Sequence, residues 1–181
     1  MPYLDLERDL DRAVVFMAAK ASEAESLPVA SILHSIRVGL RLQRDGGSRE
    51  MVLAGLLHDV VEDTHATVEE VAAQFGSEVA ELVGAMTIDE SLDSQEQNRD
   101  SVDRCTRLGR DALAIKAADI ADNLRFYLSE ANPQRLDQLA ESISYFLASS
   151  AHDLQGTEAW REISSQREVV LEMIAERDGA R

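Results

Sequence analysis

Hydrophobic residues recur every three or four positions along nearly the whole chain, and no run alternates in the manner of a β-strand. In the first predicted helix, over about residues 4–21, one side is formed by Leu6, Leu10, Val14 and Met17. The same spacing continues to the C-terminal region. The pattern therefore predicts an all-α fold.

Residues that start and stop helices divide this pattern into eight or nine segments. Ser48 and Ser77 are suited to cap helices, and Thr67 begins a capping-box sequence. Pro28 and Pro133 suit the first turn of a helix. With a polar loop at 87–95, the predicted helices cover about residues 4–21, 28–44, 48–61, 67–75, 77–86, 96–107, 111–129, 133–150 and 157–177.

The composition narrows the class of protein. A chain of 181 residues suits one domain, with a core over about 10–150 and the helix at 157–177 packing on it. No segment reads as a secretory signal or a membrane span, and a single cysteine, Cys105, suits a reducing cytoplasm. A net charge of −16 argues against nucleic acid as a partner, but not against a small phosphorylated substrate. Oligomeric state is not readable from these features.

Residues 56–64, LLHDVVEDT, place four ionisable groups in an apolar segment. On a helix, His58 and Glu62 share one face, and Asp59 and Asp63 share another. Imidazole and carboxylate groups together suit a divalent first-row metal. Because two ligands are too few, further candidates are expected on other helices.

Two more polar residues stand in otherwise apolar helices. His34 lies in VASILHSIRVGL, where a lone imidazole is most simply a hydrogen-bonded core residue. Asp119 lies in ALAIKAADIADNLRF, where a salt bridge with Lys116 or Arg125 would explain it. Taken together with His58-Asp59, the two residues indicate a metal site.

This set resembles the signature of the HD-domain metal-dependent phosphohydrolases. Within that superfamily, residues 54–87 are similar to the hydrolase domain of RelA/SpoT-type alarmone enzymes, and the small single-domain alarmone hydrolases are nearest in size. There an HDxxEDT motif precedes a capped helix ending in Phe-Gly and a Val-rich helix ending in Thr, as it does here. Residues 115–123 resemble the family's later segment, with Lys116, Asp119 and Asn123 in place.

The resemblance, which covers about residues 10–150, implies an enzyme that hydrolyses the 3′-pyrophosphate of guanosine tetra- or pentaphosphate, the stringent-response alarmone. Glu62 and Asp63 would orient the water or take its proton, and Asn123 would hydrogen-bond a ligand or the substrate ribose. Manganese is the implied metal, with other divalent first-row metals as alternatives. The four implied ligands are His34, His58, Asp59 and Asp119.

The chain departs from the family around the nucleotide. The segment before His34 is shorter and more acidic, with Ser22 where a histidine is usual. In the later segment, Ile120 replaces an arginine and Asp122 stands where a histidine is common. The cations left to contact phosphate are Lys20, Arg37, Lys116 and Arg125. The last two equally suit structural ion pairs.

Two other functions remain open at this stage. The altered segment before His34 favours a different HD-type nucleotide phosphatase or phosphodiesterase. The second is a non-catalytic module that binds a nucleotide and holds a structural metal. Such a module would have no need of the carboxylates of Glu62 and Asp63.

Overall fold

In the computed structural model, the described residues are 3–23, 29–129, 132 and 135–179. They contain ten α-helices and no strand, which confirms the all-α prediction. The number exceeds the predicted eight or nine because the third predicted helix is two helices. The predictions for Pro28 and Pro133 lie outside the described residues. None of the described helices is long and apolar enough to span a bilayer.

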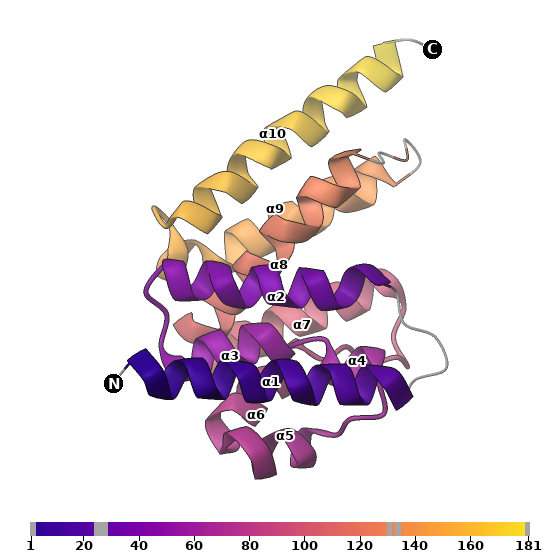
Figure 1. Ribbon diagram of the computed structural model, residues 1–181. Coiled ribbons are helices and arrows are strands. Elements are labelled where there is room, and N and C mark those ends of the chain that lie inside the picture. Colours follow the sequence, from indigo (N-terminus) through magenta and orange to yellow (C-terminus); the bar gives the residue numbers. More distant parts are fainter. Residues whose placement is uncertain (1–2, 24–28, 130–131, 133–134, 180–181) are drawn as a thin grey trace. The chain divides into compact units, whose positions relative to one another are not determined.

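The chain divides into two compact units, residues 1–87 and 88–181. That the whole chain is one domain stays a prediction. Unit 1 contains α1 (Tyr3–Glu23), α2 (Val29–Arg44), α3 (Arg49–Leu57), α4 (Val60–Asp63), α5 (Val68–Phe75) and α6 (Ser77–Met86). Unit 2 contains α7 (Ser94–Leu108), α8 (Arg110–Ser129), α9 (Leu136–Leu154) and α10 (Glu158–Gly179) (Figure 1).

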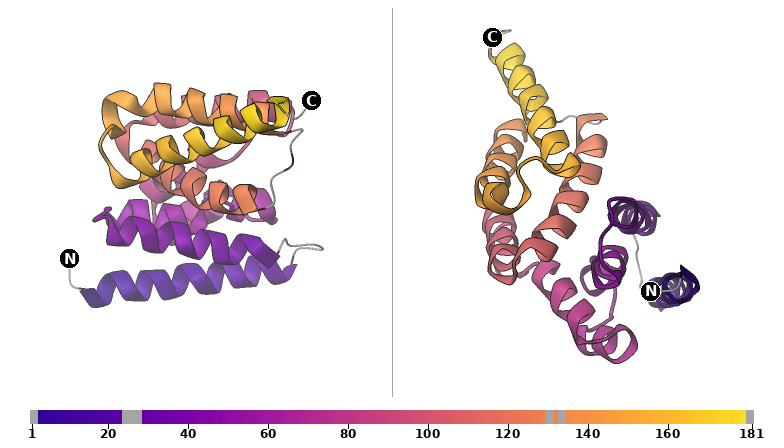
Figure 2. Two further views of the ribbon diagram at one scale, coloured as in Figure 1. Left: turned by 90° about the horizontal axis from the view of Figure 1, so that it is seen from above. Right: turned by 90° about the vertical axis from the view of Figure 1, so that its left-hand side faces the viewer.

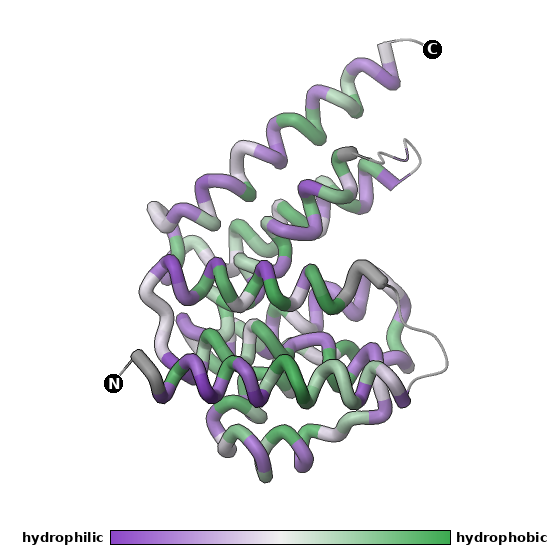
Figure 3. The backbone as a smooth tube through the Cα atoms, viewed as in Figure 1, coloured by the Kyte–Doolittle hydropathy of each residue, from purple (hydrophilic) through white to green (hydrophobic). Residues whose placement is uncertain are grey.

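In unit 1, helix α3 is the central element, since it contacts α1, α2 and α6. Six of its nine residues are buried. In the right-hand view of Figure 2, α1 and α2 are seen nearly end-on beside it. The purple and green segments that alternate along α1 in Figure 3 reflect its amphipathic sequence. Its buried face differs slightly from the prediction: Val14 is 39% exposed, and Phe16 is buried with Met17.

An ion pair ties α1 to α3. Arg49 Nε donates to Asp9 Oδ2 at 2.6 Å, and both side chains are largely buried. This hydrogen bond, with a weaker contribution from Arg12, lowers the pKa of Asp9 below its ordinary value. The pair therefore stabilises unit 1 at neutral pH.

The predicted helix starts are partly confirmed. The side chain of Ser48 accepts a hydrogen bond from the Met51 amide, and Thr67 forms the expected capping box with Glu70. The prediction for Ser77 is wrong, because Gly76 is the N-cap of α6 and Ser77 is its first residue. Gly76 has a φ of 101°, which a side chain at this position would strain.

Unit 2 is built from four helices that share one core. Helix α7 contacts α8 and α9, and α10 contacts the same two helices. Buried residues from three of these helices meet in the core: Leu113, Ile115, Leu124, Ile143, Phe146 and Ile163. The loop before α7 is shorter than predicted, because the helix begins at Ser94. Asp93 is its N-cap, and the side-chain oxygen of Asp93 accepts hydrogen bonds from the amides of Gln95 and Glu96.

Candidate metal centre

Helix α2 carries His34 against α3. The two helices approach closely at two glycines. A Cβ added at Gly55 would lie 2.3 Å from Leu42 Cδ1, and one added at Gly39 would lie 3.2 Å from Leu56 Cβ. A side chain at Gly55 would force the Leu42 side chain to move, and one at Gly39 would press on the Leu56 Cβ. This close approach lets His34, which is 8% exposed, reach the C-terminal end of α3.

The polar motif lies where α3 ends. A continuous helix to Val61 was predicted, but α3 ends at Leu57 and α4 begins at Val60. His58 and Asp59 form the turn between the two helices, although Asp63 N–H still donates to Asp59 O at 2.8 Å. Neighbouring residues of a regular helix point about 100° apart and do not face each other. The turn therefore allows two consecutive side chains to converge.

Three ligand atoms meet at this turn. His34 Nε2 lies 3.2 Å from His58 Nε2, which lies 3.0 Å from Asp59 Oδ1. The distance from His34 Nε2 to Asp59 Oδ2 is 3.8 Å, and one donor atom from each residue lies within 4.8 Å of the others. Two ligands about 2.1 Å from a metal and at right angles to each other lie about 3 Å apart. The distances of 3.0 and 3.2 Å thus fit adjacent corners of an octahedral shell, whereas the 3.8 Å distance, which runs to the other oxygen of Asp59, is wider.

The tautomer of His58 also suits a metal ligand. Its Nδ1 lies 2.9 Å from the carbonyl oxygen of Gly55, to which it donates, so Nε2 of the neutral ring carries a lone pair. A backbone carbonyl commonly orients metal-binding histidines in this way. Two imidazoles and one carboxylate form a donor set that a divalent first-row metal accepts. The residues therefore form a possible site for a divalent metal.

Asp119, the fourth predicted ligand, lies on α8 in unit 2 and is 7% exposed. Lys116 Nζ donates to its Oδ2 at 3.1 Å, and Asn123 Nδ2 donates to its Oδ1 at 2.6 Å. All three residues lie on one face of α8, because they are spaced by three and four positions. The two donors hold the carboxylate in one orientation. Its role as a ligand stays a prediction.

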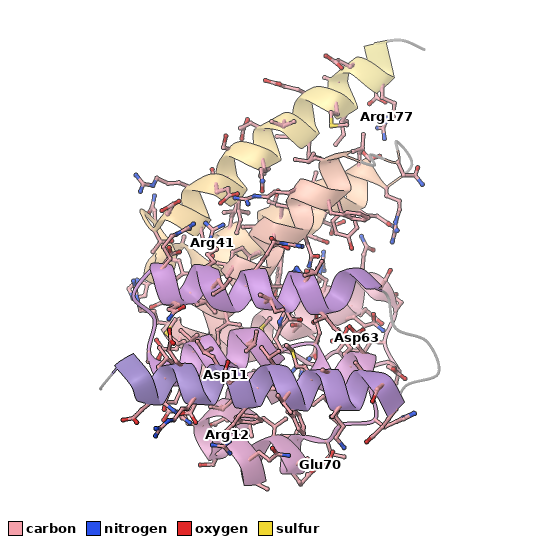
Figure 4. The ribbon with its side chains drawn as sticks, in the orientation of Figure 1. Asp11, Arg12, Arg41, Asp63, Glu70 and Arg177 are labelled. Carbon is pink, nitrogen blue, oxygen red and sulfur yellow. The ribbon has the colours of Figure 1, made fainter. Side chains whose placement is uncertain are left out.

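The two carboxylates predicted to be catalytic differ in exposure. Glu62 is exposed and Asp63 is partly buried, both on the single turn of α4. Asp63 and Asp59 line the same small hollow, together with Ser35 of α2. Figure 4 shows Asp63 labelled at α4. The structure thus places one of the two carboxylates beside a predicted metal ligand, and their catalytic roles stay predictions.

Lys20, Lys116 and Arg125, which were predicted to contact phosphate, each pair with an acidic residue of their own unit. Lys20 Nζ donates to Glu70 Oε1 at 2.6 Å; this bond raises the pKa of Lys20 and lowers that of Glu70. Arg125 donates to Glu162 at 3.0 and 2.8 Å, which is the ion-pair alternative foreseen for it. Lys116 contacts Asp119 as described above. Arg37 is exposed on α2.

Gly55 is a functional residue that sequence reasoning missed. It provides both the close helix contact and the carbonyl that orients His58. A glycine in the middle of an apolar helix costs roughly 1 kcal/mol relative to alanine. That unfavourable choice was a signal of a packing or functional requirement at this position.

Comparisons with known proteins identify the family of this chain. Residues 13–154 match the HD domain family. The chain is 32% identical over 148 residues to the human guanosine-3′,5′-bis(diphosphate) 3′-pyrophosphohydrolase MESH1, a match that covers 77% of this chain and 82% of the human protein. The Drosophila melanogaster protein of the same name is 45% identical over 75 residues. That match covers 41% of this chain and 42% of the fly protein, so the chain spans less than half of that relative.

A solved structure is also similar. It is that of a metazoan ortholog of SpoT that hydrolyses ppGpp and plays a role in starvation responses. The two chains share 27% identity with a TM-score of 0.70, over 91% of this chain and 94% of the other. The predicted resemblance is confirmed, and the relatives are named as enzymes, in line with the expectation of an enzyme. The chain belongs to the HD domain family and is related within it to the guanosine-3′,5′-bis(diphosphate) 3′-pyrophosphohydrolases.

Proposed function

We propose that the protein is a manganese-dependent hydrolase that removes the 3′-pyrophosphate of guanosine tetra- or pentaphosphate, or of a closely similar nucleotide. The observation that carries the proposal is the convergence of His34, His58 and Asp59, with ligand atoms within 4.8 Å, in a chain related to enzymes named for this reaction. A small nucleotide substrate and a cytoplasmic location are parts of the same proposal.

The residues of the site have separate tasks in the proposed reaction. His34, His58 and Asp59 would hold the manganese, with Asp119 as the proposed fourth ligand. A divalent ion held there would acidify water and offset the negative charge of the phosphoryl oxygens. Gly55 keeps the His58 ring in its orientation through the 2.9 Å hydrogen bond. Lys116 and Asn123 do the same for the Asp119 carboxylate.

Asp63 and Glu62 are the proposed acid–base groups. A general base must lie within hydrogen-bond reach of the proton that it removes. Asp63 is the better placed of the two, because it shares a hollow with the ligand Asp59, whereas Glu62 is exposed. Asp63 would take the proton of the attacking water, and Glu62 would orient the leaving group or exchange protons with solvent.

A second candidate is another HD-type nucleotide phosphatase or phosphodiesterase. It is favoured by the ion pairs of Lys20 with Glu70 and of Arg125 with Glu162. Each pair engages a cation that was expected to hold the phosphates of a guanosine nucleotide. A substrate with fewer phosphates would need fewer such contacts.

The test is pyrophosphate release from guanosine tetraphosphate by metal-stripped protein, with and without manganese. We expect release only with manganese, and its loss in Asp59→Ala. Asp111→Ala, which removes an exposed aspartate from the first turn of α8, is the matched control and should stay active. Asp63→Asn should lower kcat by about a hundredfold or more while manganese still binds.

The other outcomes separate the alternatives. Manganese-dependent release of phosphate from a different nucleotide, with none from guanosine tetraphosphate, would support the second candidate. Nucleotide binding without any hydrolysis, unchanged when Glu62→Gln and Asp63→Asn are combined, would identify a non-catalytic binding module.

A further inference from the structure

The single turn of α4 carries both proposed acid–base groups, Glu62 and Asp63. It is only four residues long, Val60–Asp63. A helix this short does not persist through its own hydrogen bonds, because closing the first turn costs more conformational entropy than one bond returns. Contacts outside the turn must therefore fix the two carboxylates.

Packing fixes the beginning of this turn. Val60 is 5% exposed, and α4 contacts α1. Towards its end the turn approaches solvent, since Glu62 is exposed and Asp63 is only partly buried. Burial of apolar side chains by itself therefore does not hold Asp63 in one place.

The hydroxyl group of Thr64 closes the other end of the turn. Thr64 is the C-cap residue and has an extended backbone, with φ −137° and ψ −174°, so the chain leaves the helix here. Its Oγ1 donates to the carbonyl oxygen of Val60 and accepts a hydrogen bond from the Ala66 amide at 3.0 Å. One hydroxyl thus bonds a carbonyl at a helix end, where helices leave carbonyls to be satisfied from outside, and also orders the turn that follows.

This arrangement fixes Asp63 on both sides. The Asp63 N–H donates to Asp59 O at 2.8 Å, and the residue after Asp63 is tied back to Val60. Thr64, Asp63 and Asp59 also line the same small hollow. The hydroxyl of Thr64 therefore acts close to the point where the Asp63 carboxylate would meet a water molecule held near Asp59.

A small displacement of this carboxylate would affect the reaction rate more than the stability of the fold. Proton transfer requires donor and acceptor atoms about 2.6–3.2 Å apart. A misplacement of about 1 Å can lower a rate about a hundredfold. Loss of one partly exposed hydrogen bond, by contrast, should lower the melting temperature by only a few degrees.

We propose that Thr64 is a positioning residue of the hydrolytic site. Its hydroxyl holds the C-terminal end of α4 closed and so keeps the Asp63 carboxylate where it can take the proton of the attacking water. The inference rests on the function proposed above, because Thr64 acts through Asp63 and has no contact of its own with substrate or metal in this scheme.

The test is pyrophosphate release from guanosine tetraphosphate by the full chain at saturating manganese. Thr64→Val replaces the hydroxyl by a methyl group of similar size, whereas Thr64→Ser keeps the hydroxyl. In Thr64→Val we expect kcat to fall about tenfold or more, with KM and manganese affinity within about twofold of the unmodified protein. Thr64→Ser should recover most of kcat.

Thr106→Val is the matched control. Thr106 lies in the last turn of α7, and its Oγ1 also donates to the carbonyl oxygen four positions earlier, that of Val102, at 2.8 Å. It is exposed and has no part in the proposed site. This variant loses the same kind of hydrogen bond and should keep the kcat of the unmodified protein.

A double-mutant cycle with Asp63→Asn separates positioning from a general structural role. If Thr64 acts through Asp63, adding Thr64→Val to the Asp63→Asn protein should change kcat by less than about twofold, because the group that Thr64 positions is already gone. A general loss of structure would lower kcat by the same factor in both backgrounds.

Three results would overturn the proposal: an unchanged kcat in Thr64→Val, a Thr64→Ser protein as slow as Thr64→Val, or equal factors in the two backgrounds. Failure of the proposed hydrolase function would look different, because no form of the protein would then release pyrophosphate. In that case hydrogen exchange of the Asp63 amide, measured by NMR, decides whether Thr64 holds Asp63. Exchange should be about tenfold faster in Thr64→Val than in Thr64→Ser, and equal exchange would overturn the proposal.

Discussion

Removing the ammonium group of Lys116 should make the stability of the protein depend on a divalent ion. The side chains of Lys116 and Asp119 are only 12% and 9% exposed, and their charged atoms lie 3.1 Å apart. Lys116→Met leaves the Asp119 carboxylate in the same buried position without this counter-charge. Breaking a buried ion pair by removal of one partner costs roughly 3–5 kcal/mol. The slight exposure of both groups favours the lower end, about 3 kcal/mol.

Thermal unfolding of metal-stripped protein measures this loss. For a chain of this length, about 3 kcal/mol corresponds to a melting temperature lower by about 6 to 12 °C. If Asp119 is a metal ligand, manganese supplies the missing positive charge. The variant should then recover most of its lost stability at saturating manganese, and its gain should exceed that of the unmodified protein.

Arg125→Met is the matched control on the same helix. It removes a hydrogen-bonded ion pair with Glu162, but the Arg125 side chain is 61% exposed. Exposed pairs contribute about 0–1 kcal/mol, so this variant should melt close to the unmodified protein with or without manganese. A loss in Lys116→Met that manganese leaves unchanged would refute the reasoning, because Asp119 would then be only a partner in a structural ion pair.

Three further changes test other parts of the structure. Asp9→Asn should cost about 1 kcal/mol at pH 7 in denaturant unfolding. Because Arg49 lowers the pKa of Asp9 from its ordinary 3.8, the stabilisation is present above about pH 4 and is lost as the pH falls through the lowered pKa. The variant should therefore lose less stability on acidification than the unmodified protein. Gly55→Ala should cost about 0–2 kcal/mol in total, because overpacking against Leu42 Cδ1 at 2.3 Å costs about 1–3 kcal/mol and the higher helix propensity of alanine offsets about 1 kcal/mol of it. The variant should also weaken manganese binding in an EPR titration. Asn98→Leu should raise the melting temperature by about 2–4 °C in scanning calorimetry, because it removes a buried oxygen that no donor among the described residues reaches; an unchanged or lower value would mean that a donor satisfies this oxygen.

The site shows where sequence periodicity ceases to be informative. The spacing of LLHDVVEDT predicts one continuous helix, because apolar residues repeat at helical intervals on both sides of His58. The turn at His58 and Asp59 depends instead on what their side chains contact in the folded unit. Helical spacing assigns these two residues to different faces, and the structure brings their ligand atoms to 3.0 Å.

The cations predicted to contact phosphate illustrate the same limit. The sequence shows that Lys20 and Arg125 are cations in suitable segments. It does not show which acidic residues they pair with. Their partners, Glu70 and Glu162, are 50 and 37 positions away along the chain. No local pattern predicts such pairings, because they depend on how separate helices pack.

The sequence by itself determined the helical class, most helix boundaries, the capping box at Thr67 and the family. Each of these depends on interactions within a few residues or on a motif that is itself local. Only the tertiary structure decided which polar groups meet. The glycine contact between α2 and α3 brings His34 to His58, and the packing of α7, α8 and α9 leaves a pocket beside Phe126. These features arise from distances between segments that are remote along the chain, and such distances are set when the apolar faces of the helices are buried together.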